Sequence, residues 1–376
     1  MLHFTNYGTS GSRVVVQRFE SFHPPPLQDD AVDDSWPLTG SHRRTLRFAD
    51  DDDAVDPTSS SRGCCVKRDV KDAVDHGGGG GVDDVFHDVR PIGVLVGQFG
   101  RYVDAPDALP GTFRSPSSID CACDGRLAIV DADTGAVQIF DGSGDCLSGF
   151  RVVGARAACF IADAARGQSL AVATDSGVSV CDQAGRVDKQ LPLGADLVAV
   201  AALRHAGGGV FVAAHRSRLT ICDRYQPTAL LRSLGCVRPL NTAAGSPAVQ
   251  FGDIAALATT ATPRVYVADA GAVLAVDVDS GTLLRSFTAA GTRLLRQPSA
   301  VGVDLVTGGV FVSDAGTRRL LQFEATGGRY RCVAELPADA GRCVALAAGP
   351  RDHAGHQTVY VVCRGHCSAQ VHMYQI

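Results

Sequence analysis

The sequence predicts an all-β fold, a six-bladed β-propeller that follows an N-terminal tail of different composition. Two observations predict it: a phrase that repeats from about residue 116 to the C-terminus, and a short β-strand pattern that occurs six times. The phrase is fullest at 116–147 and returns at 298–324. Such a repeat, made of short β runs without a 3.6-residue period, is typical of sheets that pack radially around an axis.

The strand pattern alternates apolar residues and ends in Asp or a small residue, and the ends of successive copies lie 40 to 55 positions apart. This spacing suits four short strands per unit. The copies are Leu127–Asp131, Leu170–Thr174, Val210–Ala214, Val265–Asp269, Val310–Asp314 and Val359–Cys363. A second run follows each copy after a short turn, at 137–140, 178–181, 219–222, 273–276, 320–323 and 371–374.

The two ends of the repeat region predict how the ring closes. The chain stops at Ile376, directly after the third strand of the last unit, and an apolar run at 91–100 precedes the first unit. We expect residues 91–100 to supply the missing fourth strand, because pairing the two ends removes open sheet edges.

The residues from Pro116 to Leu147 resemble the NHL repeat, whose pattern is roughly P-x-G-I-A-V-D, x-I-Y-V-A-D, R-I-Q-V-F-D and x-x-G-x-F-L. The match is good at 116–147 and 298–324, fair at 252–287, and weak at 159–192, 200–231 and 342–376. The resemblance implies six blades. The signatures of WD repeats are absent, since the one tryptophan is Trp36.

Residues 1–89 differ from the rest of the chain. They are rich in Asp, Pro, Gly and Ser and carry a net charge of −7, whereas residues 90–376 carry +2. This composition predicts a disordered acidic tail at 1–89 and a folded domain at 90–376. The one strand-like run of the tail is Arg13–Phe19.

The sequence shows neither a signal segment nor a stretch apolar enough to span a membrane. Residues 1–20 have no apolar signal segment, and no stretch approaches 18 apolar residues. Several of the 13 cysteines lie inside predicted strands, such as Cys146, Cys181 and Cys222. Buried, reduced thiols in a cytoplasmic protein are the expectation.

Two groups of residues resemble metal-binding sites, but an ordinary loop and a set of turn caps explain them better. Cys363, His366 and Cys367 offer three zinc-type ligands, but a structural zinc site needs four, so we interpret them as an ordinary loop. Asp131, Asp269 and Asp314 occupy equivalent positions, and we expect each to cap the turn after its strand rather than bind a cation. No catalytic motif appears, and no metal or cofactor is predicted.

The positions of the arginines predict that one face of the propeller is basic. Loops that join strand four to strand one, and strand two to strand three, share a face. There the sequence places Arg101, Arg114, Arg151, Arg156, Arg216, Arg218, Arg238, Arg293, Arg296, Arg318, Arg319 and Arg364. The opposite face gathers Asp141, Asp145, Asp182, Asp223, Asp277, Asp279 and Glu324. Because Arg pairs well with carboxylate and phosphate, the basic face is the predicted partner-binding surface.

The predicted function is a non-catalytic recognition module. The repeats resemble the C-terminal propeller of tripartite-motif NHL proteins, which implies either a protein partner that is a substrate for ubiquitination or an RNA ligand. The RING array, B-box and coiled coil of that family are not present among these residues, so ligase activity cannot be assigned to them. The alternative is a repressor that binds single-stranded RNA, with Tyr102 and Phe113 as stacking residues. A propeller hydrolase or lyase is disfavoured, and neither DNA nor a membrane is a predicted partner.

Overall fold

The computed structural model describes residues 4–7, 14–19, 90–105, 109–163, 167–204, 209–225, 230–239, 248–288, 295–325 and 330–376. The chain divides into two units, residues 1–22 with 88–376, and residues 23–87. All described residues belong to the first unit. Most of the predicted tail therefore lies outside the described residues.

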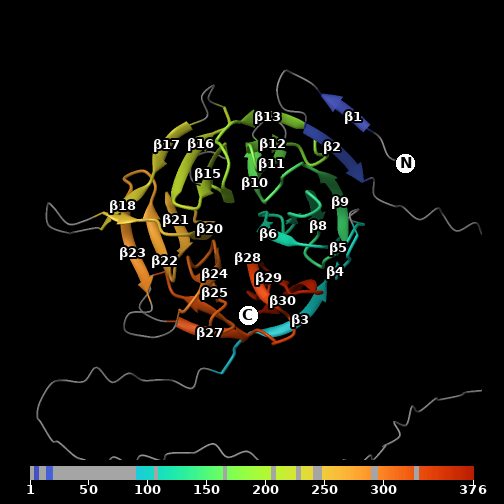
Figure 1. Ribbon diagram of the computed structural model, residues 1–376. Coiled ribbons are helices and arrows are strands. Elements are labelled where there is room, and N and C mark those ends of the chain that lie inside the picture. Colours follow the sequence, from blue (N-terminus) through green and yellow to red (C-terminus); the bar gives the residue numbers. More distant parts are fainter. Residues whose placement is uncertain are drawn as a thin grey trace, which may run out of the picture. The chain divides into compact units, whose positions relative to one another are not determined.

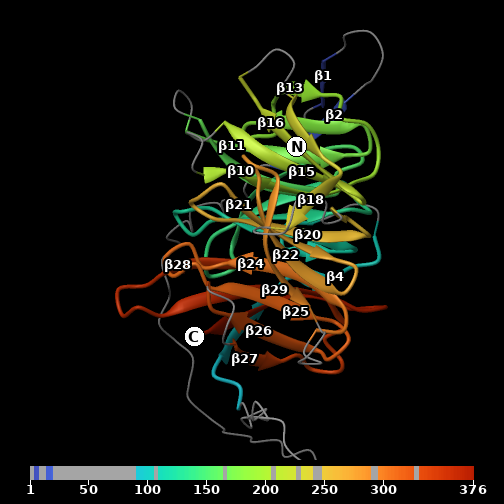
Figure 2. The same cartoon turned by 90° about the vertical axis from the view of Figure 1, so that its left-hand side faces the viewer.

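The first unit is a six-bladed β-propeller (Figure 1), which confirms the predicted fold class. Each blade is built on four antiparallel strands with the first strand innermost, and the strands follow chain order except in blade 6, whose outermost strand comes from before blade 1. The inner strands contact one another in sequence, and the contact of the last with the first closes the ring. Figure 2 shows the same propeller after a turn of 90°.

The first three blades follow one another without interruption. Blade 1 is β6 (Pro116–Cys121), β7 (Leu127–Asp131), β8 (Ala136–Phe140) and β9 (Cys146–Arg151). Blade 2 is β10 (Ala157–Asp163), β11 (Gly167–Thr174), β12 (Gly177–Cys181) and β13 (Val187–Leu191). Blade 3 is β14 (Leu197–Ala202), β15 (Val210–His215), β16 (Arg218–Asp223) and β17 (Leu230–Leu234). Blades 2 and 3 are complete although the repeat pattern is weak there.

The other three blades complete the circle. Blade 4 is β20 (Ile254–Thr259), β21 (Arg264–Asp269), β22 (Ala272–Asp277) and β23 (Thr282–Thr288). Blade 5 is β24 (Pro298–Val303), β25 (Val310–Asp314), β26 (Arg319–Phe323) and β27 (Tyr330–Glu335). Blade 6 is β28 (Arg342–Arg351), β29 (Gln357–Arg364), β30 (Ala369–Gln375) and β3 (Val94–Phe99).

Strand β3 closes the ring, as the sequence predicts. It pairs antiparallel with β30, with Val94 opposite Gln375 and Phe99 opposite Val371. The residues just before it also bond blade 5, because the Gly93 amide donates to the Val333 carbonyl at 2.9 Å. A Cβ atom at position 93 would lie 2.9 Å from Val333 atoms, so glycine permits this approach. The closing segment therefore joins blades 5 and 6.

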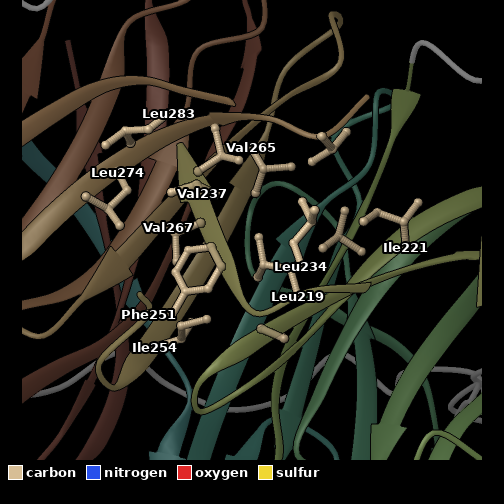
Figure 3. Close-up of a cluster of buried hydrophobic side chains, with 14 of the residues drawn as sticks. Leu219, Ile221, Leu234, Val237, Phe251, Ile254, Val265, Val267, Leu274 and Leu283 are labelled. Atoms are coloured by element: carbon tan, nitrogen blue, oxygen red, sulfur yellow. The ribbon is translucent and has the colours of Figure 1, made fainter. Parts of the chain in front are cut away.

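Hydrophobic side chains fill the spaces between neighbouring blades, because each sheet has two apolar faces. The space between blades 3 and 4 holds Leu219 and Leu234 from one side and Val265, Val267 and Leu274 from the other (Figure 3). Five further clusters occupy the other junctions. Burial of each such side chain stabilises the fold by about 1.5–3 kcal/mol.

The inner strands present open edges to the central channel, and side chains of neighbouring blades satisfy part of their backbone. Ser117 Oγ of blade 1 donates to the Arg156 carbonyl at 2.6 Å, before blade 2. Thr259 Oγ1 of blade 4 donates to the Ala202 carbonyl at 2.6 Å. Polar residues on inner strands thus couple one blade to the next.

Six further strands decorate the propeller. Blade 4 gains β18 (Cys236–Pro239), which pairs parallel with β23, and β19 (Val249–Gln250). In blade 1, β2 (Val14–Phe19) pairs with β9 and carries β1 (Phe4–Tyr7). The strand-like run of the tail thus corresponds to β2. The pair β4 (Arg101–Tyr102) and β5 (Thr112–Phe113) leads from β3 into blade 1.

Candidate interaction face

The observed topology gathers the predicted arginines on one side of the disc, which we call the arginine face. It carries the turns between strands two and three and the connections from each blade to the next. Its described members are Arg101, Arg114, Arg151, Arg156, Arg216, Arg218, Arg296, Arg318, Arg319 and Arg364. The predicted Arg293 and the side chain of Arg238 lie outside the described residues.

Buried aspartates shape the loops of this face. In blade 1, Asp131 is fully buried and accepts hydrogen bonds from the backbone amides of Arg114 (2.6 Å), Ser115 (2.8 Å) and Thr134 (3.1 Å). The bond to Thr134 caps the turn after the strand, as the sequence predicts. The other two hold the segment that enters the blade, which the sequence analysis did not foresee.

Buried aspartates hold the loops of blades 4 and 5 in the same way. Asp269 accepts from the amides of Gly252 and Asp253, and Asp314 accepts from those of Arg296 and Thr317. Each carboxylate is thus occupied by backbone donors of its own blade. These bonds fix the position from which Arg114, Arg296 and their neighbours project into solvent.

Several arginines of the face form ion pairs with acidic residues from adjacent loops. Arg156 Nε lies 2.9 Å from Asp175, and Arg216 Nη1 lies 3.1 Å from Asp253. Arg319 binds Glu335 through two nitrogens, at 2.8 and 3.2 Å. Longer contacts join Arg114 to Asp104 (3.5 Å) and Asp133 (3.8 Å). All these pairs are substantially exposed, so the face is a mixed-charge surface rather than a uniformly basic one.

Other arginines lack an acidic partner within the described part of the chain. Arg101, Arg296 and Arg318 are exposed, and no ion pair joins any of them to a described residue. Arg364 Nη1 donates to the neutral Ser115 hydroxyl at 2.7 Å, and Arg218 approaches His215 Nδ1 at 3.5 Å. Arg151, half-buried at the end of β9, is not one of these arginines, because it has a partner of its own. Cationic groups therefore remain available on this face.

One of the two predicted stacking residues is unavailable. Phe113 is 1% exposed and packs against Phe140 with ring centroids 5.8 Å apart, so it belongs to the core between blades 6 and 1. The prediction that Phe113 is a loop aromatic is therefore wrong, because its apolar ring is buried as β5 enters blade 1. Tyr102 is half-buried.

The opposite face carries the predicted acidic turns, but many of its carboxylates serve the turns themselves. Asp141 Oδ1 accepts from the amides of Ser143, Gly144 and Asp145, each at 2.9 Å. Burial pushes the pKa of Asp141 upward, but these bonds together lower it below its ordinary value. Such an aspartate stays ionised while it stabilises its turn.

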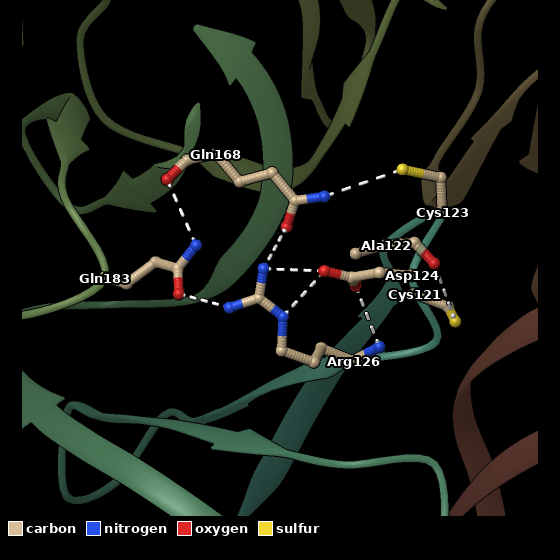
Figure 4. Close-up of polar contacts among 7 residues, drawn as sticks. All are labelled: Cys121, Ala122, Cys123, Asp124, Arg126, Gln168 and Gln183. Carbon is tan, nitrogen blue, oxygen red and sulfur yellow. Dashed lines mark hydrogen bonds and ion pairs between the residues drawn. The ribbon is translucent and has the colours of Figure 1, made fainter. Parts of the chain in front are cut away.

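Arginines also occur on that opposite face, which the sequence analysis did not foresee. Arg126 pairs with Asp124 at 2.7 Å and bonds the side-chain oxygens of Gln168 and Gln183 in blade 2 (Figure 4). Gln183 returns a bond to the Gln168 carbonyl at 3.2 Å. This hydrogen-bond network joins blades 1 and 2. The one feature of the sequence that could have indicated it is the position of Arg126, directly before the second strand of blade 1.

The central channel narrows to a cavity of about 70 Å³ between the inner strands. Asp120 of β6 faces it and accepts a bond from the Phe160 amide at 2.8 Å. Burial raises the pKa of Asp120, while the Arg204 charge opposes that rise. Arg204 reaches across from blade 3 to the Cys121 carbonyl at 3.2 Å, so it ties blade 3 to blade 1 across the channel.

The cysteine and histidine cluster does not converge. Cys363 is 1% exposed within blade 6, opposite Cys343, whereas His366 and Cys367 are exposed in the following turn. No group of three metal-type ligands comes together in the described ranges.

Within the described part of the chain, no helix is long and apolar enough to cross a membrane.

Comparison with known proteins finds similarity among solved structures. No family model matches the chain, and no curated protein matches it. Among solved structures, the chain is similar to the β-propeller domain of Cps50 (Swd1) from Myceliophteria thermophila. The identity is 15%, with 69% of this chain and 84% of that chain covered and a TM-score of 0.46. The NHL resemblance stays a prediction, and the propeller assignment comes from the sheet topology.

Proposed function

We propose that the propeller is a non-catalytic recognition module, and that its arginine face binds a protein partner through an acidic segment. The supporting observation is that exposed arginines project from loops held by buried aspartates. A pre-organised loop reduces the entropy lost on binding, and guanidinium groups bind carboxylates with two parallel hydrogen bonds.

The charge pattern favours protein over RNA as the ligand. Arg156, Arg216 and Arg319 each lie beside a carboxylate, so an RNA strand with a charge at every phosphate would be repelled at several points of the face, whereas a short acidic segment can bind where the arginines have no carboxylate beside them. RNA binding without sequence preference requires a continuous basic groove with stacking rings, and the burial of Phe113 removes one of the two predicted rings. A protein surface can instead offer both charge signs and match this pattern.

The NHL resemblance supports a narrower proposal. The partner is a substrate for ubiquitination, and the transfer chemistry belongs to other residues or another protein. The cytoplasm is the proposed compartment, because the described cysteines are free thiols and many are buried in the strands. Single-stranded RNA remains the alternative ligand.

The test compares two probes on the full chain by fluorescence anisotropy: a labelled peptide rich in Glu and Leu, and a poly-uridine of equal length. The variant replaces Arg216, Arg218, Arg318 and Arg319 by Ala, and the control replaces Arg186 and Arg331 on the opposite face. We expect the variant alone to lose peptide binding, with no RNA binding at low or physiological salt. RNA binding with a steep salt dependence that the variant flattens would establish the alternative.

A further inference from the structure

The arginine face is divided into two unequal parts by its acidic residues. In blades 1 to 4, Arg114, Arg156 and Arg216 are each paired with a carboxylate. Two isolated exceptions are Arg218, which approaches His215, and Arg101, which precedes blade 1 and forms no ion pair with a described residue. In blades 5 and 6, four exposed arginines have no acidic partner among the described residues: Arg296, Arg318, Arg342 and Arg364. We call these four the blade 5–6 arginines. The segment 289–294, which precedes Arg296 in the sequence, contains no Asp or Glu.

Two of these arginines oppose each other directly. Arg342 begins β28 and lies across from Arg364 at the end of β29. Like charges directly opposite on adjacent strands are destabilising. Arg364 has only the Ser115 hydroxyl as a described partner, so no carboxylate compensates the pair within its own blade. An anionic group bound from outside would relieve this repulsion.

The other two arginines lie close together in blade 5. Arg296 precedes β24, and Arg318 precedes β26 in the turn after β25. A Cβ atom at Gly316 would lie 2.5 Å from the Arg296 Cβ, so glycine lets the two loops touch. Arg318 has a φ of 55°, a conformation that non-glycine residues seldom adopt. Backbone strain of this kind often occurs at binding sites.

A single connection joins the two pairs into one surface. The Leu336 amide donates to the Arg318 carbonyl at 2.8 Å, and the loop then runs to Gly341. A Cβ atom at Gly341 would lie 2.5 Å from the Arg364 carbonyl oxygen. This loop carries one acidic residue, Asp339, which forms no ion pair with a described residue, while Glu335 is committed to Arg319.

We infer that the partner's acidic segment docks across blades 5 and 6, on the blade 5–6 arginines, and not over the whole arginine face. This inference rests on the proposed function. The ligand chemistry is a peptide with several carboxylates, because each of the four guanidinium groups on one continuous surface can donate two parallel hydrogen bonds to a carboxylate.

The test uses two triple variants of the full chain that each remove three positive charges. One is Arg296→Gln, Arg318→Asn and Arg342→Gln, with Asn chosen because it tolerates the left-handed backbone at 318. The matched control is Arg114→Gln, Arg156→Gln and Arg216→Gln. A third variant, with Lys at 296, 318 and 342, keeps the charge and controls for folding.

Affinity for the labelled Glu/Leu peptide is measured for all of them. We expect the blade 5–6 variant to lose about ten-fold and the control less than about two-fold, with the Lys variant close to the parent. Equal losses in both triple variants would overturn the localisation and leave the proposed function standing. If the parent itself fails to bind the peptide, the proposed function and this inference both fail.

Discussion

Single carboxylates hold the loops from which the arginines project. Asp131 and Asp314 are fully buried, and each accepts hydrogen bonds both from the segment that enters its blade and from the turn after its strand. Blade 2 has Thr174 at this position and blade 6 has Cys363. Threonine and cysteine side chains accept fewer hydrogen bonds than a carboxylate. They therefore cannot hold the loops of blades 2 and 6 as Asp131 and Asp314 hold those of blades 1 and 5.

Replacement of Asp131 by Ala should therefore be costly. It leaves the buried amides of Arg114 and Ser115 without an acceptor, and we expect a loss of about 3 kcal/mol in the free energy of unfolding. Asp141→Ala also removes bonds to three amides, but in an exposed turn where water replaces them, and should cost about 1 kcal/mol. Urea denaturation of the two variants measures both values, and equal losses would contradict the role given to Asp131.

A buried histidine makes the stability depend on pH. His372 is 2% exposed, and neither ring nitrogen has a hydrogen-bond partner among the residues that the structure describes. Burial lowers the pKa of His372, while the Asp339 charge acts in the opposite direction. In the unfolded chain the pKa of histidine is about 6.5. The stabilising contribution is therefore fully present above that pH and is lost as the pH falls below it.

We expect the free energy of unfolding to fall between pH 7.5 and 5.5, with His372 contributing up to about 1.4 kcal/mol per pH unit below pH 6.5. The variant His372→Met should show a flatter dependence, because it removes the group that the unfolded chain protonates. His366→Met changes an exposed histidine and should keep the dependence of the parent. Parallel curves for parent and His372→Met would show that this histidine titrates alike in both states.

Among the strands, the sequence predicts those whose pattern is local. The second strand of each blade alternates apolar residues and is confirmed in all six blades. Strands β18 and β19 are not predictable in this way, because β18 pairs parallel with β23, more than 40 residues further along the chain. Blades 2 and 3 fold although their repeat pattern is weak, because small side chains such as Ala171 and Ala213 pack in the space between the two blades.

The closing strand carries a prediction at this scale. Removal of residues 1–89 takes away β1 and β2, of which β2 pairs with β9 at only two positions, but leaves β3 and the four strands of every blade in place. The thermal midpoint should therefore stay close to that of the full chain. Removal of residues 1–101 takes β3 away and exposes the edge of β30 and the apolar side chains beneath it, so the midpoint should fall sharply. Calorimetry of the two shortened chains decides the question, and equal midpoints would refute the closure by β3.

For the whole molecule, the sequence could predict which face carries the arginines of the arginine face, because the order of strands and loops decides it, but it did not predict arginines of the opposite face such as Arg126. What it could not predict is which arginines are neutralised. Asp253, the partner of Arg216, lies 37 residues further along, before blade 4, and only the folded ring brings the two together. Glu335 lies opposite Arg319 because of the register of β26 and β27. For the same reason Arg342 was missed, because its opposition to Arg364 depends on the register of β28 and β29.

The central claim is that the arginine face, and not the opposite face, receives an acidic partner. Hydrogen exchange of the full chain, with and without saturating Glu/Leu peptide, tests it most directly. We predict that the peptide slows exchange in the turns 315–318 and 365–368, which lie on the arginine face of blades 5 and 6. Slowed exchange confined to the turns 142–145 and 183–186 of the opposite face would contradict the account.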